Sequence, residues 1–321
     1  MRGRREKGRR VDGWVVLDKP VGLTSTEAVA RVKRLFSAAK AGHAGTLDPL
    51  ASGCLPIALG EATKTVTHAM QGEKLYRFTV RWGAETDTDD TEGRVVTTSE
   101  RRPTEPEVRA ALPEFIGRIM QVPPRFSAVK IAGERAYDLA REGEAVEIKP
   151  REIAVHRLDL ISRPDADTAV FVAECGKGAY VRALARDLGR RLGVYGHVIQ
   201  LRRLGVGPFG EEQMISLEKL EELRHKAGAS GGSDPAEVLL SVATALDGIP
   251  ALAMTERDAA RLRRGQAVIL RGRDAPVMSG PAYAVFGGLP VALGEVDKGA
   301  FHPRRVFNLP DGRDRPGAEN S

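Results

Sequence analysis

Apolar and polar positions alternate with different periods along the chain, and each period predicts an element. The segment GWVVLDKP is a short apolar run that ends at Pro20, which is typical of a buried strand. In LYRFTVRW the apolar residues occupy every second position, so a strand with one buried face is expected. Thr24 and Glu27 have the spacing of a capping box. A helix is therefore predicted after Thr24, with an apolar face formed by Ala28, Val32, Leu35 and Phe36.

The same reasoning predicts further elements in the rest of the chain. The glycine-rich stretch that begins at Lys40 is expected to be a loop, followed by a helix in LGEATKTVTHAM. Further helices are predicted at 105–116, 135–142 and 180–192, and further strands near 126–131, 145–161, 168–175 and 197–206. Many strands follow one another with few helices between them. The pattern therefore favours an α+β fold with a mostly antiparallel, mixed sheet over a doubly wound parallel one.

Changes in composition divide the chain into parts. The first ten residues contain six Lys or Arg and one Glu, whereas the whole chain has a formal net charge of +6. Residues 1–10 are therefore predicted to be a flexible basic arm, either a solvated tail or a tether for phosphates. One large domain is expected over 11–247, with a mobile loop at 227–235. Short strands with Gly and Pro turns then predict a small β-rich domain over 248–310, and 311–321 is expected to be a disordered tail.

Several classes of protein are excluded by composition. Cys54 and Cys175 have no CxxC partner, and the six histidines show no HxxxH or HxxEH spacing. Neither a disulfide framework nor a metal site is therefore expected, and a reducing cytoplasm fits. The chain has no run of 18 apolar residues and no apolar segment after its basic start, so neither a membrane helix nor a secretory signal is predicted.

Two short motifs resemble functional signatures but lack the required context. GVGPFG at 205–210 matches GxGxxG, yet no βαβ unit surrounds it, so a dinucleotide site is rejected. DTDDT at 87–91 matches the DxDxT pattern of aspartyl-phosphate hydrolases, but Asp87 does not directly follow a buried strand. A solvated acidic turn is the favoured interpretation. A magnesium-dependent hydrolase that uses Asp87 is kept as an alternative function.

One carboxylate occupies an unusual place in the chain. Asp48 lies within GHAGTLDPLASGCLPIALGEATK, among glycines and apolar residues. Aspartate is charged at neutral pH, so burial of its side chain needs a cationic or hydrogen-bonding partner. On spacing alone, a turn with Asp before Pro is favoured over a catalytic role.

The stretch around Asp48 resembles the signature of the bacterial tRNA pseudouridine-55 synthases, the TruB family. Further blocks resemble the family in the same order, and together they cover about residues 11–210. They are GWVVLDKPVGLTS, KLYRFTVRWGAETDTDDTEG, VPPRFSAVKIAGERAYDLAREG, CGKGAYVRALARDLGRRLG and HVIQLRRLGVGPF. The last 60 residues resemble, more weakly, the family's small RNA-binding appendage, which is related to PUA domains. The resemblance therefore implies a catalytic domain of pseudouridine synthase type followed by a PUA-like domain.

The resemblance also implies a role for six residues. Asp48 is implied as the nucleophile, and Arg182 as the cation that keeps it ionised and oriented. Tyr76 is implied to stack on the flipped uracil and to assist proton transfer at C5. Tyr180 and Leu201 are implied to contact the base, and His43 to fill the space that the base leaves. Without the resemblance, Tyr76 and Leu201 would be taken as core residues, Arg182 as a surface arginine and His43 as a cap of the glycine-rich turn.

The activity implied is the isomerisation of uridine to pseudouridine at position 55 in the T-loop of tRNA, by base flipping. No atoms or electrons are exchanged in this reaction, so no cofactor is expected. The implied protein is a monomeric, cytoplasmic RNA-modification enzyme whose partner is the tRNA T-arm, without an obligate protein partner. A covalent acylal and a glycal route both stay open. The alternative is a catalytically inactive RNA-binding member of the same fold, or one with another target, such as relatives that depend on a guide RNA.

Overall fold

The computed structural model describes residues 8–126, 130–131, 134–135, 148–227, 235–270 and 278–310. Residues 1–7 of the predicted arm, residues 136–142 of the predicted helix 135–142, most of the loop predicted at 227–235 and the predicted tail lie outside these ranges. At the start of the described chain, Arg9 pairs with Ala38, and its N–H donates to the carbonyl of Ser37. The division into domains stays a prediction.

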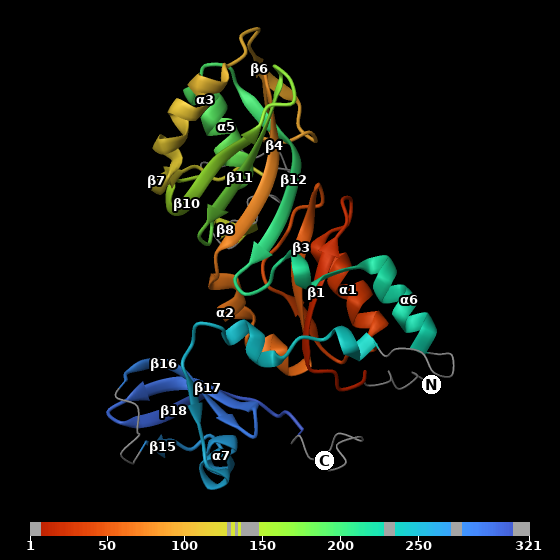
Figure 1. Ribbon diagram of the computed structural model, residues 1–321, viewed down its shortest axis with the longest axis vertical. Coiled ribbons are helices and arrows are strands. Elements are labelled where there is room, and N and C mark those ends of the chain that lie inside the picture. The colour runs from red at the N-terminus through yellow and green to blue at the C-terminus, as the bar shows by residue number, and fades with distance from the viewer. Residues whose placement is uncertain are drawn as a thin grey trace.

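Within the described residues, a sheet of nine strands forms the centre of the fold (Figure 1). Its order is β13-β1-β3-β12-β4-β11-β10-β7, with β2 beside β3. Neighbours are antiparallel except for the pairs β1–β13 and β3–β12, which confirms a mostly antiparallel mixed sheet. The strands are β1 Gly13–Lys19, β2 Ala41–His43, β3 Ala51–Leu59, β4 Lys74–Trp82, β7 Gly117–Gln121, β10 Arg151–Ser162, β11 Thr168–Cys175, β12 Gly196–Val206 and β13 Met214–Ser216.

Helices and small hairpins surround this sheet. The helices beside it are α1 Ser25–Leu35, α2 Val66–Gln71, α3 Glu105–Ala111, α5 Val181–Arg191 and α6 Leu217–Ala227, whereas α7 Glu256–Arg263 packs on the C-terminal strands. Thr24 caps α1 as predicted, since the Glu27 N–H donates to the Thr24 hydroxyl at 3.2 Å. The small hairpins pair β5 Ala84–Thr86 with β6 Val95–Thr98, and β8 Lys130–Ile131 with β9 Glu134–Arg135. No helix of the described chain is both long and apolar enough to cross a membrane.

The prediction of a loop in the glycine-rich stretch was wrong for residues 41–43, which form the short strand β2, and for residues 51–59, which form the interior strand β3. This strand is covered on both faces, so its residues are apolar without alternation and its Gly and Pro resemble a loop sequence. Gly53 has a φ of +100°. A Cβ there would lie 2.2 Å from the carbonyl oxygen of Arg203, so a residue with a side chain could not bring β3 this close to β12.

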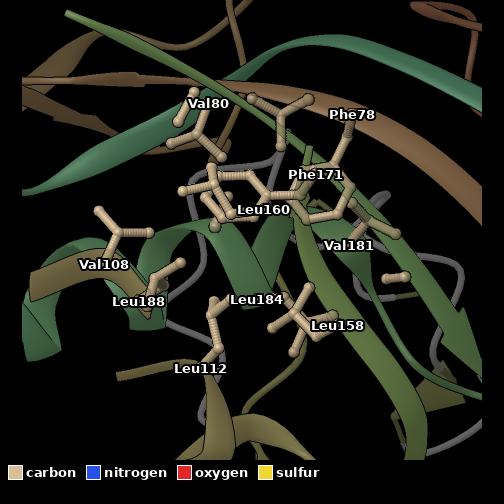
Figure 2. Close-up of a cluster of buried hydrophobic side chains, with 14 of the residues drawn as sticks. Phe78, Val80, Val108, Leu112, Leu158, Leu160, Phe171, Val181, Leu184 and Leu188 are labelled. Carbon is tan, nitrogen blue, oxygen red and sulfur yellow. The ribbon is translucent and has the colours of Figure 1, made fainter. Parts of the chain in front are cut away.

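A core cluster fixes α5 against one half of the sheet (Figure 2). Phe78 of β4 and Phe171 of β11 stack with ring centroids 5.4 Å apart. From α5, Val181, Leu184 and Leu188 pack into the same cluster. Burial of each such side chain contributes about 1.5–3 kcal/mol to folding, so the position of α5 is firmly set. The N-terminal residues of α5 are therefore held at a defined place beside the sheet.

The C-terminal residues form a second, β-rich unit, as predicted (Figure 1). Its sheet has the order β14-β16-β17-β18-β15, with β14 Ala251–Ala253, β15 Val268–Ile269, β16 Gly280–Phe286, β17 Leu289–Asp297 and β18 Ala300–Val306. Phe307 and Leu293 pack in one buried cluster with Trp14 of β1. Helix α7 was not predicted, because its sequence, ERDAARLR, has only a narrow apolar face.

Candidate active site

Asp48 lies on the connection between β2 and β3, and its backbone is fixed on both sides. The Leu47 N–H donates to the Ser25 hydroxyl at 2.8 Å, and that hydroxyl lies 2.9 Å from the Leu47 carbonyl. After the acid, the Ala51 N–H donates to the Asp48 carbonyl at 3.0 Å. The Asp48 side chain is 39% exposed. A rigid loop thus presents a carboxylate that a ligand can reach.

Arg182 contacts this carboxylate from the first turn of α5. Its Nη2 lies 2.9 Å from Oδ2 of Asp48, and its Nη1 lies 3.1 Å from Oδ2 of Asp90. Nη2 also donates to the carbonyl of Phe126 at 3.1 Å. The Arg182 side chain is only 9% exposed, so its charge is weakly screened by water. This buried cation pairs with the Asp48 carboxylate and limits the orientations of its side chain.

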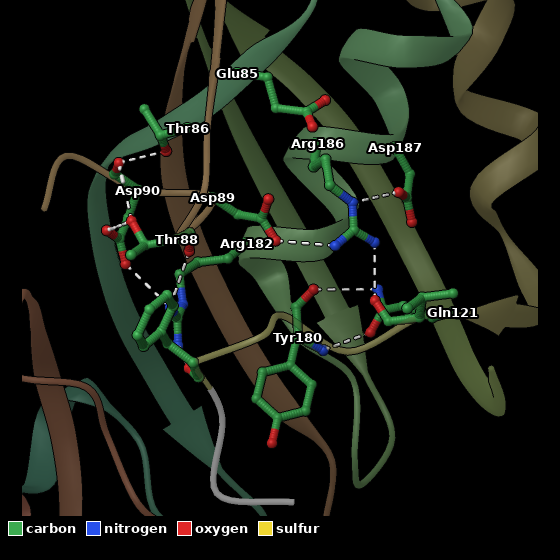
Figure 3. A network of polar contacts seen from close by, with 12 residues as sticks. Glu85, Thr86, Thr88, Asp89, Asp90, Gln121, Tyr180, Arg182, Arg186 and Asp187 are labelled. Atoms are coloured by element: carbon green, nitrogen blue, oxygen red, sulfur yellow. Dashed lines mark hydrogen bonds and ion pairs between the residues drawn. The ribbon is translucent and has the colours of Figure 1, made fainter. Parts of the chain in front are cut away.

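The prediction of a solvated acidic turn at 87–91 was wrong for Asp89 and Asp90 (Figure 3). Asp89 and Asp90 are only 4% and 5% exposed. Asp90 pairs with Arg182, and Asp89 Oδ2 lies 2.9 Å from Nη1 of Arg186. The cations that allow this burial lie far along the sequence, on α5, so local polarity did not reveal them. A signal was present, since three arginines recur every fourth residue in VRALARDLGRR.

Lys19 is a buried neighbour of Asp48 that sequence reasoning did not single out. Its amine donates to the carbonyls of Pro20 at 2.8 Å and Leu23 at 2.7 Å, and lies 3.4 Å from the carbonyl of Pro49. Burial lowers the pKa of Lys19 to about 8, while the charge of Asp48 opposes this shift. The amine therefore ties the end of β1 to the residue that follows Asp48. A lysine inside the apolar run GWVVLDKP was the available signal.

We expect Lys19→Met to lower the free energy of unfolding by about 1–3 kcal/mol, because buried carbonyls lose their donor. Urea unfolding followed by circular dichroism measures this change, with the exposed Lys40→Met as the control. An unfolding midpoint equal to that of the wild type would show that the Lys19 amine does not stabilise the loop.

A cleft of about 680 Å³ brings three of the predicted residues together. Asp48, Arg182 and Leu201 line it, and Asp90 lines it too. Leu201 reaches this place because β12 pairs with both β3 and β4 there, opposite Ala51 and Phe78. The parallel pairing of β12 with β3 covers only residues 201–203, so the sheet opens beside the Asp48 loop.

Tyr76, Tyr180 and His43 are not among the described residues that line this cleft. Burial raises the pKa of Tyr76 and the charge of Arg203 opposes the shift, so its phenol is neutral at pH 7. The charge of Asp48 adds to this rise in pKa, so the two side chains are near enough to interact electrostatically. Tyr76 packs against the core cluster of α5.

Tyr180 and His43 have well-defined backbone positions. The Tyr180 N–H donates to Oε1 of Gln121 at 2.9 Å, and its carbonyl accepts from Nε2 of the same side chain at 3.1 Å. The Arg151 guanidinium lies 5.0 Å from the centre of the Tyr180 ring. His43 ends β2 opposite Ile57, and burial lowers the pKa of its imidazole, which is therefore neutral at pH 7.

The chemistry of this site is that of one accessible carboxylate beside a buried cation. Such a carboxylate can attack or stabilise a cationic carbon centre, or accept a proton. Among the described residues, no group of three or more His, Cys, Asp or Glu side chains is arranged to hold a metal ion. The cleft also offers apolar surface from Leu201 and Phe78, which suits a flat, partly apolar ligand.

Two family models match the chain. The model described as "TruB family pseudouridylate synthase (N terminal domain)" matches residues 33–181, and "tRNA pseudouridylate synthase B C-terminal domain" matches residues 182–247. A protein of Bradyrhizobium diazoefficiens named tRNA pseudouridine synthase B is 65% identical over 305 residues, which cover 95% of this chain and 88% of that protein. Its namesake in Agrobacterium fabrum is 55% identical, over 95% of this chain and 97% of that protein.

Solved structures resemble the fold. The crystal structure of an archaeal box H/ACA sRNP Nop10-Cbf5 complex matches with a TM-score of 0.72 and 25% identity, over 94% of this chain and 88% of that one. An H/ACA RNP bound to a substrate RNA containing 2'-deoxyuridine matches with a TM-score of 0.73 and 24% identity, over 94% of this chain and 86% of that one. The latter likeness concerns the fold alone.

Proposed function

The chain belongs to the TruB family of pseudouridylate synthases, and on this premise we propose that it converts uridine 55 in the T-loop of tRNA to pseudouridine. The observation that carries the proposal is the contact of the accessible Asp48 carboxylate with the buried Arg182 guanidinium, at 2.9 Å, in a cleft. When the glycosidic bond breaks, C1′ becomes cationic, and the carboxylate that Arg182 holds can stabilise it. The activity is an isomerisation, so the substrate RNA and the product RNA have the same composition.

The proposed reaction needs few protein groups. The N1–C1′ bond of the uridine breaks, the uracil turns, C5 bonds to C1′, and the proton of C5 leaves while N1 gains one. Asp48 either attacks C1′ to form an acylal, from which C5 later displaces it, or removes a proton from C2′ to give a glycal and returns that proton when C5 bonds to C1′. Both routes need its ionised form. Arg182 pairs with that form. The neutral phenol of Tyr76 assists proton transfer at C5 mainly through proximity, because its pKa is raised.

Base flipping accounts for the remaining residues of the proposed site. The target atom cannot be reached inside a stacked loop, so the nucleotide leaves the stack before it reacts. In the proposal, the rings of Tyr76 and Tyr180 receive the uracil, and Leu201 contacts it from β12. His43, whose imidazole is neutral, enters the space that the base leaves.

We also propose that the chain acts as a monomer in the cytoplasm on the T-arm of tRNA, without an obligate protein partner. What supports this is the match to two family models named for pseudouridylate synthases and the absence of any requirement for a further group in the reaction. The alternative is a member of the same fold that binds RNA without turnover.

Tritium release tests the proposed activity. The purified chain is incubated with a tRNA transcript that carries [5-³H]uridine. We expect one equivalent of tritium per tRNA to be released, because the C5 proton is lost once per turnover at one site. A chain that binds the transcript but releases no tritium would be an RNA-binding protein, and the proposed function would be wrong.

His43→Ala is expected to slow extrusion of the target base by about tenfold, with little change in the rate of initial docking. The reason is that unstacking costs a few kcal/mol, part of which the inserted imidazole offsets. Stopped-flow fluorescence of a base analogue in the T-loop measures both steps, with the exposed His225→Ala as the control. Equal extrusion kinetics in the two variants would assign His43 a structural role only.

A further inference from the structure

Three arginines on α5 form ion pairs with one acidic segment, residues 85–90. Figure 3 shows the pairs that Arg182 and Arg186 form. Arg182, Arg186 and Arg190 lie four residues apart, so they share one face of the helix. Arg182 pairs with Asp90 at 3.1 Å, Arg186 with Asp89 at 2.9 Å and Arg190 with Glu85 at 2.5 Å. Three successive ion pairs therefore attach the acidic segment to α5. The pair nearest the cleft is that of Arg182, which also contacts Asp48.

The middle pair, Asp89 with Arg186, is as deeply buried as the pair of Arg182 with Asp90. Arg186 uses all three nitrogens: Nε lies 2.8 Å from Oδ1 of Asp187, Nη1 contacts Asp89, and Nη2 donates to the Val122 carbonyl at 2.8 Å. The outer pair, Arg190 with Glu85, is less buried, because the Arg190 side chain is 54% exposed. A buried ion pair is costly to form and adds little stability over an apolar contact, so stability alone does not explain the middle pair.

The backbone of Asp89 links this pair to the cleft. Asp89 has a φ of +62°, and its carbonyl accepts from the Val198 N–H of β12 at 3.1 Å. Its side chain is held by α5, so the residue is fixed from two elements at once. Asp90 is the next residue, and its carboxylate contacts Arg182. A shift of Asp89 would therefore move Asp90, and with it the guanidinium that holds Asp48.

We propose that Asp89 and Arg186 are positioning residues for the reaction: their buried ion pair fixes the acidic turn against α5 so that Asp90 and Arg182 hold Asp48 in its reactive orientation. The inference rests on the proposed function. Neither residue lines the cleft, so both act through Arg182 and Asp90. A misplacement of about 1 Å at a reacting group can cost on the order of a hundredfold in rate, so a pair outside the cleft can have a large effect.

The test compares the middle pair with the outer pair. Asp89→Asn is isosteric and suits the positive φ, so it removes the charge without straining the turn. Arg186→Met and Arg186→Lys complete the set. Glu85→Gln in β5 and Arg190→Met in α5 are the matched controls, because they change the outer ion pair of the same helix. For each variant, the single-turnover rate at saturating tRNA, the KM and the Tm are measured.

We expect Asp89→Asn and Arg186→Met to lower the single-turnover rate by about tenfold or more, with KM within about twofold of the wild type. Arg186→Lys should recover part of the rate, because it keeps the charge. Glu85→Gln and Arg190→Met should stay within about twofold in rate, even where they lower the Tm.

The positioning role would be wrong if the variants of both pairs lost rate in proportion to their loss of Tm. It would also be wrong if the variants of the middle pair changed only the KM. If Arg186→Met does not fold, Asp89→Asn decides the question in the same assay. A wild-type chain without turnover would instead refute the proposed function, so the two failures are distinguishable.

Discussion

Asp48→Asn is expected to lower turnover by about 10⁴-fold or more, while the Kd for tRNA stays within about twofold of the wild type. The two side chains have the same shape, so the loop fixed by Ser25 should keep its structure. The amide can neither attack C1′ nor remove a proton, whichever route the reaction takes. Tritium release measures turnover, and filter binding of labelled tRNA measures the Kd.

Asp247→Asn is the matched control, at an exposed position outside the cleft, and it should retain full turnover. Turnover of Asp48→Asn within tenfold of the wild type would remove this carboxylate from the chemistry. A large loss of tRNA affinity in the same variant would instead mean that Asp48 mainly binds substrate.

Arg182→Met is expected to lower the single-turnover rate by about 10²–10³-fold, because Asp48 loses the preorganised charge beside it. It should also lower the free energy of unfolding by about 3–5 kcal/mol, since Asp90 is left as a buried charge without this partner. Single-turnover kinetics at saturating tRNA and urea unfolding measure the two effects.

The double variant Arg182→Met with Asp90→Asn separates the two effects. Removal of the buried charge of Asp90 should restore much of the stability but none of the rate. A double variant that recovers both would show that Arg182 acts only by stabilising the fold.

Elements with a clear local period could be predicted from the sequence. Strand β4 has strict alternation and α1 has a capping box, so both were predicted close to their observed bounds. Strand β3 was missed because both of its faces are buried, which removes the alternation that distinguishes a strand from an apolar loop. Its Gly53, which a loop prediction uses as a turn signal, is required by the close approach of β12.

The site could be predicted in part, and mainly through resemblance to a family. Bare spacing favoured a turn at Asp48, because its cation lies on a distant helix and no local pattern links the two. The burial of Asp89 and Asp90 was missed for the same reason. Lys19 was missed because a single lysine in an apolar strand has no period to mark it. The roles of Tyr76, Tyr180, Leu201 and His43 stay proposals.

The most direct test of the central claim is the mapping of pseudouridine in an unmodified tRNA transcript after incubation with the purified chain. The account predicts a single new pseudouridine, at position 55 of the T-loop, and none after incubation with Asp48→Asn. An unmodified uridine 55 after incubation with the wild-type chain, or pseudouridine only at other positions, would contradict it.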